Sequence, residues 1–145
     1  MRLIGHRGAR NEAPENTLGG FKHIIALGLK AVEFDVRLLQ DQQLAVIHDD
    51  NFLRTTGLDQ TIAMTSSYQL AHTDNRVGWD HWPQAEPTPL LAEVLDLIRH
   101  FEHIEVEINA VNEEQQAQLI ASKLHQVLEG WQDRVTFTSF DLKVL

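Results

Sequence analysis

The sequence predicts an α/β fold of the β/α (TIM-type) barrel class, with about five strands present and the barrel incomplete. Short apolar runs alternate with segments of helical periodicity, which is the order of a parallel sheet covered by helices. Polar residues directly follow the first four apolar runs, where such barrels carry their functional sites. The chain of 145 residues is shorter than the roughly 250 residues of a typical barrel, so we expect that it does not close on itself.

The chain opens with an expected β-α-β unit. A short buried strand is expected over residues 1–5, and Asn16 or Thr17 can cap the following helix. Gly28 ends this helix, and a strand over 31–36 follows within a few residues, so the two strands should be parallel. The helix carries apolar residues at helical spacing, namely Leu18, Phe21, Ile24, Ile25 and Leu27.

The third apolar run, over 44–47, follows a polar turn that is too short to contain a helix. If this run pairs with the second as a hairpin, Asp35 falls opposite His48. If the chain instead crosses back extended, both residues still lie at the C-terminal ends of strands. Both arrangements bring the two side chains together.

A long polar stretch over 49–88 has no lasting periodicity. Its Gly, Asp, Asn and Pro content predicts a lobe over the sheet, and long loops in compact domains are usually functional. Within it, Thr65 can cap a helical turn that runs to Leu70. For Trp79 and Trp82 we favour local packing over ligand stacking.

The rest of the chain repeats the alternation of helix and strand, and residues 1–145 are expected to form one partial domain with a lobe at about 49–88. The expected elements are a helix that begins at Pro89, a strand over 104–109, a helix over 112–129, a strand over 135–138 and a helix barely begun near Asp141.

The composition excludes several functions. The formal net charge of −9 and the lack of a basic run argue against nucleic-acid binding. Without cysteine there is no disulfide, thiolate metal site or thiol nucleophile. No apolar run approaches the length of a transmembrane helix. Only five residues precede His6, too few for a signal peptide, so we expect a cytoplasmic protein.

Glu33 and Asp35 are the most informative residues. Alternate residues of a strand share a face, so the two carboxylates point the same way. In a partly buried place they repel each other, and a cation or hydrogen-bond donors would relieve the repulsion. A polar strand face in water is the plainer interpretation of these two residues alone. The pairs His6-Arg7 and His48-Asp49, each after its own apolar run, favour a catalytic site.

Together these motifs resemble the N-terminal part of the glycerophosphodiester phosphodiesterase family. The resemblance runs from Ile4 to the last residue, and it rests on several short motifs in the family's order and approximate spacing. They are His6-Arg7-Gly8, Pro14-Glu15-Asn16-Thr17, Glu33-Phe34-Asp35-Val36, Asp41, His48-Asp49, Glu105-Val106-Glu107-Ile108 and Ser139-Phe140.

The resemblance implies a metal centre and two catalytic histidines. Glu33, Asp35 and Glu107 match the family's metal-binding carboxylates, which suit a divalent metal, Ca²⁺ or Mg²⁺. His6 and His48 match its general base and general acid, in an order that the sequence leaves open.

The resemblance also implies substrate contacts. Arg7 matches a catalytic residue that holds phosphoryl oxygens. Asn109 stands where the family typically has lysine, so it can donate a hydrogen bond but brings no charge, and Phe140 is a further expected contact. For Asn16 and Thr17, ligand contact and positioning of the first helix are equally open. Glu105 is expected outside the metal shell, and structural roles are expected for His23, His72, His81, His100, His103 and His125.

The implied activity is the metal-dependent hydrolysis of glycerophosphodiesters to sn-glycerol 3-phosphate and an alcohol. One alternative is a phospholipase D-like hydrolysis of lysolipids, with an apolar entrance built by the lobe. Another is an inactive, truncated domain that binds metal or phosphate. An incomplete barrel would expose open strand edges and an apolar interior, so we also expect self-association.

Overall fold

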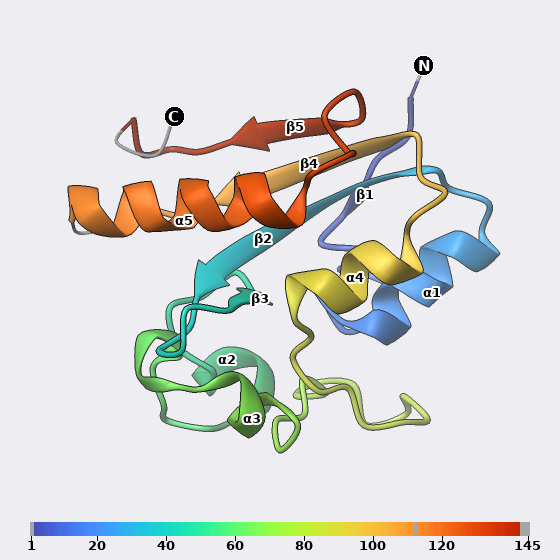
Figure 1. Ribbon diagram of the computed structural model, residues 1–145. Coiled ribbons are helices and arrows are strands. Elements are labelled where there is room, and N and C mark those ends of the chain that lie inside the picture. Colours follow the sequence, from blue (N-terminus) through green and yellow to red (C-terminus); the bar gives the residue numbers. More distant parts are fainter. Residues whose placement is uncertain (1, 112, 143–145) are drawn as a thin grey trace.

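The computed structural model describes residues 2–111 and 113–142, which form one sheet with helices and a lobe around it (Figure 1). Four strands are parallel, in the order β1-β2-β4-β5, and β3 pairs with β2 in the antiparallel direction. The strands are β1 (Gly5–His6), β2 (Ala31–Leu38), β3 (Leu44–Val46), β4 (His103–Ile108) and β5 (Val135–Thr138).

Strands β2 and β3 form a hairpin. Val36 pairs with Val46, and next along the hairpin the Ile47 N–H donates to the Asp35 carbonyl at 3.1 Å. The hairpin alternative is therefore confirmed, but its expected register is wrong, because Ile47 faces Asp35 and His48 lies one residue beyond. Among the described residues the sheet has the expected five strands, of which four are parallel and β3 is antiparallel.

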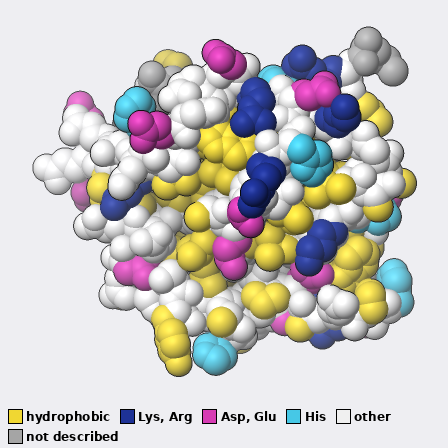
Figure 2. Space-filling model, turned by 45° about the vertical axis from the view of Figure 1, so that its right-hand side comes forward, with side chains coloured by type: hydrophobic (Ala, Val, Ile, Leu, Met, Phe, Trp, Pro, Cys, Tyr) yellow, Lys and Arg dark blue, Asp and Glu magenta, His cyan; other side chains and the backbone are white. Residues whose placement is uncertain are grey.

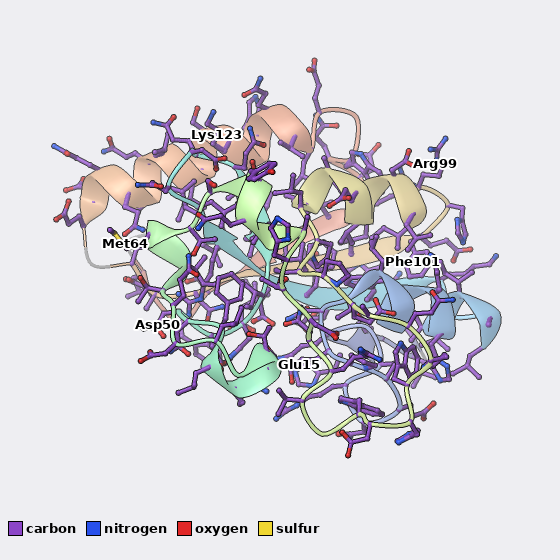
Figure 3. The ribbon with its side chains drawn as sticks, turned by 90° about the horizontal axis from the view of Figure 1, so that it is seen from below. Glu15, Asp50, Met64, Arg99, Phe101 and Lys123 are labelled. Atoms are coloured by element: carbon purple, nitrogen blue, oxygen red, sulfur yellow. The ribbon has the colours of Figure 1, made fainter. Side chains whose placement is uncertain are left out.

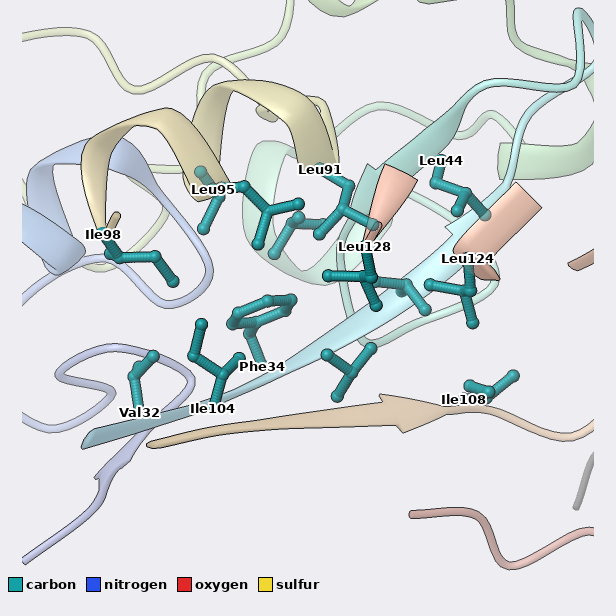
Figure 4. Close-up of a cluster of buried hydrophobic side chains, with 14 of the residues drawn as sticks. Val32, Phe34, Leu44, Leu91, Leu95, Ile98, Ile104, Ile108, Leu124 and Leu128 are labelled. Carbon is teal, nitrogen blue, oxygen red and sulfur yellow. The ribbon is translucent and has the colours of Figure 1, made fainter. Parts of the chain in front are cut away.

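Helices cover one face of the sheet. They are α1 (Leu18–Ala26), α4 (Leu91–Leu97) and α5 (Glu114–Val127). Alternate residues of β2 and β4 point to this face and are apolar, so sheet and helices bury a common core. Figure 4 shows part of this core, with Val32, Phe34, Leu44, Leu91, Leu95, Ile98, Ile104, Ile108, Leu124 and Leu128 labelled.

The opposite face of β2 and β4 is acidic. The parallel register places Glu33 beside Glu105 and Asp35 beside Glu107. In a β/α barrel the face away from the helices is the interior. The expectation of an exposed apolar interior is therefore wrong for these two strands, because their alternation of apolar and acidic residues turns the apolar side toward the helices.

The lobe has a small core of its own. It contains α2 (Leu53–Thr56), the 3₁₀ helix η1 (Ile62–Met64) and α3 (Ser67–Leu70). Ser66, rather than Thr65, caps α3, and its backbone N–H donates to the Gln69 side-chain oxygen at 2.9 Å. The second core joins the lobe to the hairpin and comprises Leu39, Ala45, Ile47, Phe52, Ile62 and Leu70.

Glu86 fixes the end of the lobe to the N-terminus of α1. This buried carboxylate accepts hydrogen bonds from the Gly19 N–H and from the indole N–H of Trp82, both at 2.9 Å. A Cβ at position 19 would overlap the Glu86 carboxylate, so the contact requires glycine. Trp82 packs edge-on against Trp79, with ring centroids 6.2 Å apart. These contacts agree with the expected local packing of the tryptophans.

Some element boundaries differ from expectation. β1 holds only Gly5–His6, and Leu3 is 67 % exposed, so residues 2–4 do not form the expected buried strand. Pro89 precedes α4 instead of beginning it, because its carbonyl accepts a hydrogen bond from the Val46 N–H and so stays beside β3. The helix expected near Asp141 falls largely outside the described residues.

Apolar side chains reach the surface beside α5 and β5. A groove of about 350 Å³ lies between these elements, lined by Leu124, Val135 and Phe137 among others, and Phe137 is 43 % exposed. Figure 2 shows one face of the molecule, on which hydrophobic side chains gather across the middle and charged side chains interrupt them. No helix in the described part of the chain has the length and hydropathy needed to cross a membrane.

We expect the 145-residue chain to self-associate through this region. Within the described residues β5 pairs only with β4, and an unpaired strand edge exposes N–H and C=O groups that invite another strand. Light scattering should give a mass above the 16.5 kDa of one chain. Phe137→Lys should lower this mass, whereas Leu27→Lys, at an exposed apolar residue elsewhere, should not. A monomer at every concentration would contradict the prediction.

Candidate active site

Three carboxylates converge on the face of β2 and β4 that lies away from the helices. Glu33 and Asp35 alternate along β2, and the parallel register sets Asp35 beside Glu107. One oxygen from each carboxylate lies within 4.8 Å of the other two. Hard divalent cations prefer such oxygen ligands. The structure therefore brings together the three residues that were expected to bind a metal.

Asp35 is the most buried member of this carboxylate cluster, with 0 % exposure. Its Oδ2 accepts a hydrogen bond from Asn16 Nδ2 at 2.9 Å and lies 3.3 Å from Nε of Arg7. Its Oδ1 accepts from Asn109 Nδ2 at 3.3 Å. These donors offset the cost of burying the carboxylate. Asn16 therefore contacts the cluster directly, whereas the Thr17 side chain caps α1.

The negative charge of Glu33 is less well compensated by hydrogen-bond donors than that of Asp35. Burial, together with the nearby charges of Asp35 and Glu107, raises the pKa of Glu33 from 4.5 to about 7. Its Oε2 accepts a hydrogen bond from the Arg7 backbone N–H at 2.9 Å, but its buried Oε1 has no hydrogen-bond partner among the described residues. A divalent cation would satisfy this oxygen and offset the clustered negative charge. The donor set thus fits Ca²⁺ or Mg²⁺.

The loop after β1 brings Arg7 and His6 to the cluster. Arg7 has a φ of 49°, which is uncommon outside glycine, and in this conformation its N–H reaches Glu33 while its guanidinium reaches Asp35. His6 Nε2 lies 3.8 Å from Glu33 Oε2. Burial and the charges of Arg7 and Arg10 lower the pKa of His6, so its imidazole is neutral near neutral pH.

His48 lies on the loop after β3. Its carbonyl accepts a hydrogen bond from Arg37 Nε at 2.7 Å, and its ring Nδ1 lies 2.6 Å from Asp49 Oδ1. Among the described residues, His48 makes no ion pair with the carboxylate cluster. Ile47 and not His48 stands opposite Asp35, so the expected meeting of the Asp35 and His48 side chains stays a prediction.

A chain of ion pairs links His48 to the carboxylate cluster. Arg54 pairs with Asp49 at 2.8 Å and with Glu15 at 2.7 Å, and Glu15 pairs with Arg7 at 3.1 Å. Figure 3 shows Glu15 beside the helix α2 that carries Arg54. Sequence reasoning did not identify Arg54, because its partner Glu15 lies 39 residues earlier in the chain. The Pro14-Glu15-Asn16-Thr17 motif was the sequence feature that could have pointed to this network of ion pairs.

Two further residues lie apart from the cluster. Glu105 is 2.9 Å from His103 Nε2 and is not one of the clustered carboxylates. Phe140 follows β5 and is 95 % exposed, so its substrate contact stays a prediction. The neighbouring Ser139 hydroxyl donates to the Ile108 carbonyl at 2.7 Å, which ties this segment to the end of β4.

Carboxylates, an arginine and a histidine thus meet where the parallel strands β1 and β4 end, with Glu33 and Asp35 of β2 beside them in register. In β/α barrels this edge carries the active site. The fold and the site define the class as a β/α-barrel protein with an acidic centre suited to a cation and an anionic ligand. The chain belongs to the glycerophosphoryl diester phosphodiesterase family, whose sequence profile matches residues 6–145.

Relatives and solved structures agree with this assignment. A glycerophosphodiester phosphodiesterase of Bacillus altitudinis is 32 % identical over 141 residues, which are 96 % of this chain and 58 % of the relative. A human lysophospholipase D is 38 % identical over 60 residues, which are 41 % of this chain and 19 % of the relative.

Among solved structures, that of an Oleispira antarctica phosphodiesterase in complex with the product sn-glycerol-3-phosphate is 30 % identical, with a TM-score of 0.87. The match covers 99 % of this chain and 59 % of that one. A Thermotoga maritima glycerophosphodiester phosphodiesterase is 30 % identical with a TM-score of 0.69, covering 100 % of this chain and 57 % of that one. The chain therefore spans about three fifths of the length of these matching proteins.

Proposed function

We propose that the protein is a glycerophosphodiester phosphodiesterase, which hydrolyses glycerophosphodiesters to sn-glycerol 3-phosphate and an alcohol. The observation that carries this proposal is the cluster of Glu33, Asp35 and Glu107 beside Arg7 and His6, in a chain of this family. The Oleispira antarctica phosphodiesterase in complex with the product sn-glycerol-3-phosphate supports the same product here.

The three clustered carboxylates would hold a divalent cation, Ca²⁺ or Mg²⁺. Two observations on Glu33 support this: its Oε1 has no hydrogen-bond partner in the described part of the chain, and its pKa is raised, so a cation would stabilise the ionised carboxylate. When bound, such a cation polarises the phosphoryl group as a Lewis acid. Asn16 and Asn109 donate hydrogen bonds to Asp35 and so hold one ligand carboxylate in place.

The chain's own residues would bind the phosphoryl group and move two protons. Arg7 presents its guanidinium beside the cluster, where it can bind non-bridging phosphoryl oxygens. Hydrolysis requires that the attacking hydroxyl lose a proton and that the leaving alkoxide gain one. His6 and His48 are the residues proposed for these transfers. Asn109 adds a hydrogen-bond donor without charge, so binding of the phosphate depends mainly on Arg7 and the cation.

A second candidate function is the phospholipase D-like hydrolysis of lysolipids, favoured by the identity with a human lysophospholipase D over 41 % of the chain. Parallel assays with glycerophosphocholine and lysophosphatidylcholine, with and without Ca²⁺ or Mg²⁺, separate the two. Faster turnover of lysophosphatidylcholine would favour the second candidate. Metal binding without turnover of either substrate would instead leave an inactive metal- or phosphate-binding domain.

Calorimetric titration with Ca²⁺ and Mg²⁺ tests the proposed metal site. We expect the wild-type protein to bind one cation, and Glu107→Gln to weaken the affinity by at least about 10-fold, because it removes a charged ligand. Glu105→Gln is the matched control, since Glu105 shares the strand and the face but lies outside the cluster. A wild-type protein that binds neither cation, or a Glu107→Gln variant with unchanged affinity, would disprove the site.

A further inference from the structure

His48 lies against an ionised carboxylate. Its ring Nδ1 is 2.6 Å from Asp49 Oδ1, which is within the range of charge-assisted hydrogen bonds. Hydrogen bonds from Arg54 lower the pKa of Asp49 to about 2, so Asp49 has no proton to donate near neutral pH. Nδ1 of His48 must therefore be the donor. This leaves Nε2 as the ring nitrogen that can exchange a proton with a substrate.

Arg54 fixes the orientation of Asp49. Its Nε donates to Asp49 Oδ2 at 2.8 Å, and its Nη2 donates to Asp49 Oδ1 at 3.1 Å. Two bonds from one planar guanidinium set the plane of the carboxylate, which the single charge of an ammonium group cannot do. Asp49 Oδ1 is also the oxygen that accepts from His48. The direction of the His48 ring therefore depends on Arg54.

Glu15 holds the other edge of the same guanidinium. Arg54 Nη1 donates to Glu15 Oε2 at 2.9 Å, and Nη2 donates to Oε1 at 2.7 Å. Burial acts to raise the pKa of Glu15, but the hydrogen bonds and charges of Arg54 and Arg7 bring it below its ordinary value. The Glu15 side chain is only 11 % exposed and also accepts from Arg7. Arg54 is thus clamped between two ionised carboxylates.

We propose that Arg54 is a positioning residue: held by Glu15, it orients Asp49 so that Asp49 fixes the tautomer and the direction of the His48 imidazole. This inference deepens the proposed function and rests on it, because it concerns the proton transfer assigned to His48. Arg54 lies on α2, outside the carboxylate cluster, and its side chain is 46 % exposed. It acts through Asp49 and not on the substrate.

Nitrogen-15 NMR of the histidine rings tests this inference without an assay of turnover. At mildly alkaline pH the nitrogen chemical shifts report which ring nitrogen of His48 carries the proton. In the wild-type protein we expect the Nδ1–H tautomer of His48. In Arg54→Gln this tautomer should fall from the major to the minor form. Arg54→Lys should restore it only in part, because lysine lacks the planar fork.

Arg99→Gln is the matched control. Arg99 forms a surface ion pair with Asp96, so this variant also removes an Arg–Asp pair but away from His48. It should leave the His48 tautomer as in the wild type. If Arg54→Gln does not fold, Arg54→Lys decides instead. A wild-type tautomer in Arg54→Lys would overturn the inference, because charge alone would then orient Asp49.

Steady-state kinetics supply a second measurement. We expect Arg54→Gln to lower kcat by about 10²-fold, as for a misplaced catalytic group, and KM to change much less, because Arg54 reaches the phosphate-binding Arg7 only through Glu15. Arg99→Gln should keep both constants. An unchanged His48 tautomer in Arg54→Gln overturns the inference. A changed tautomer with unchanged kcat instead overturns the catalytic role of His48, and with it the part of Arg54 in the reaction.

Discussion

Alanine in place of His6 or His48 is expected to lower kcat for glycerophosphocholine by at least about 10²-fold. Each imidazole is proposed to transfer one of the two protons that hydrolysis requires. The affinity for Ca²⁺ or Mg²⁺ should stay close to that of the wild type, because the proposed ligands are the three carboxylates and neither histidine is among them. Kinetic assays of His6→Ala and His48→Ala, together with calorimetry, measure both quantities.

His125→Ala is the control for these variants. His125 lies exposed on α5, on the helix side of the sheet, and should keep the wild-type kcat. Wild-type turnover in His6→Ala or in His48→Ala would show that the histidine concerned has only a structural role. A large loss of metal affinity in either variant would show that the ring takes part in the metal site.

Glu33→Gln is expected to change how stability depends on pH in the metal-free protein. The pKa of Glu33 is raised from 4.5 to about 7 on folding, so between these values the folded state binds a proton that the unfolded state has lost. The wild-type free energy of unfolding should therefore fall as pH rises through this window, by an amount on the order of 3 kcal/mol. The variant lacks this titration and should be the more stable protein near pH 8.

Urea unfolding at about pH 5 and about pH 8 in the presence of a chelator measures this difference. Added Ca²⁺ should reverse the order near pH 8, because a bound cation stabilises the folded wild-type protein and the variant lacks a ligand. Glu105→Gln, outside the cluster, should keep the wild-type pH dependence. A Glu33→Gln variant whose stability follows the wild-type curve at both pH values would show that Glu33 does not titrate in this window.

Local periodicity explains most of what could be predicted about the fold. The alternation of helix and strand predicted the layer of helices over a parallel sheet, and the structure confirms it. The i, i+2 spacing predicted that Glu33 and Asp35 share a face, because side chains of a strand alternate whatever the strand pairs with. The same spacing placed Glu107 on the acidic face of β4. The face on which each of these residues lies depends only on the geometry of its own strand.

The sequence was less informative about which strands pair and where the helices and strands begin and end. Periodicity located the run 44–47, but its antiparallel register follows from the turn and from packing against the lobe. Thus Ile47 faces Asp35 where His48 was expected. Pro89 is compatible with the first turn of a helix, yet its carbonyl is taken by β3. In both cases a contact between distant segments outweighs the local preference.

The sequence by itself determined the fold class, the acidic face of the sheet and the motifs that carry the family resemblance, because all of these are periodic or local. Only the tertiary structure decided how His48 is joined to the carboxylate cluster. That connection runs through Asp49, Arg54, Glu15 and Arg7, which come from two separate loops and a short helix. The decisive pair, Arg54 with Glu15, joins residues 39 positions apart, and a contact at that separation has no period, so it exists only once the chain has folded.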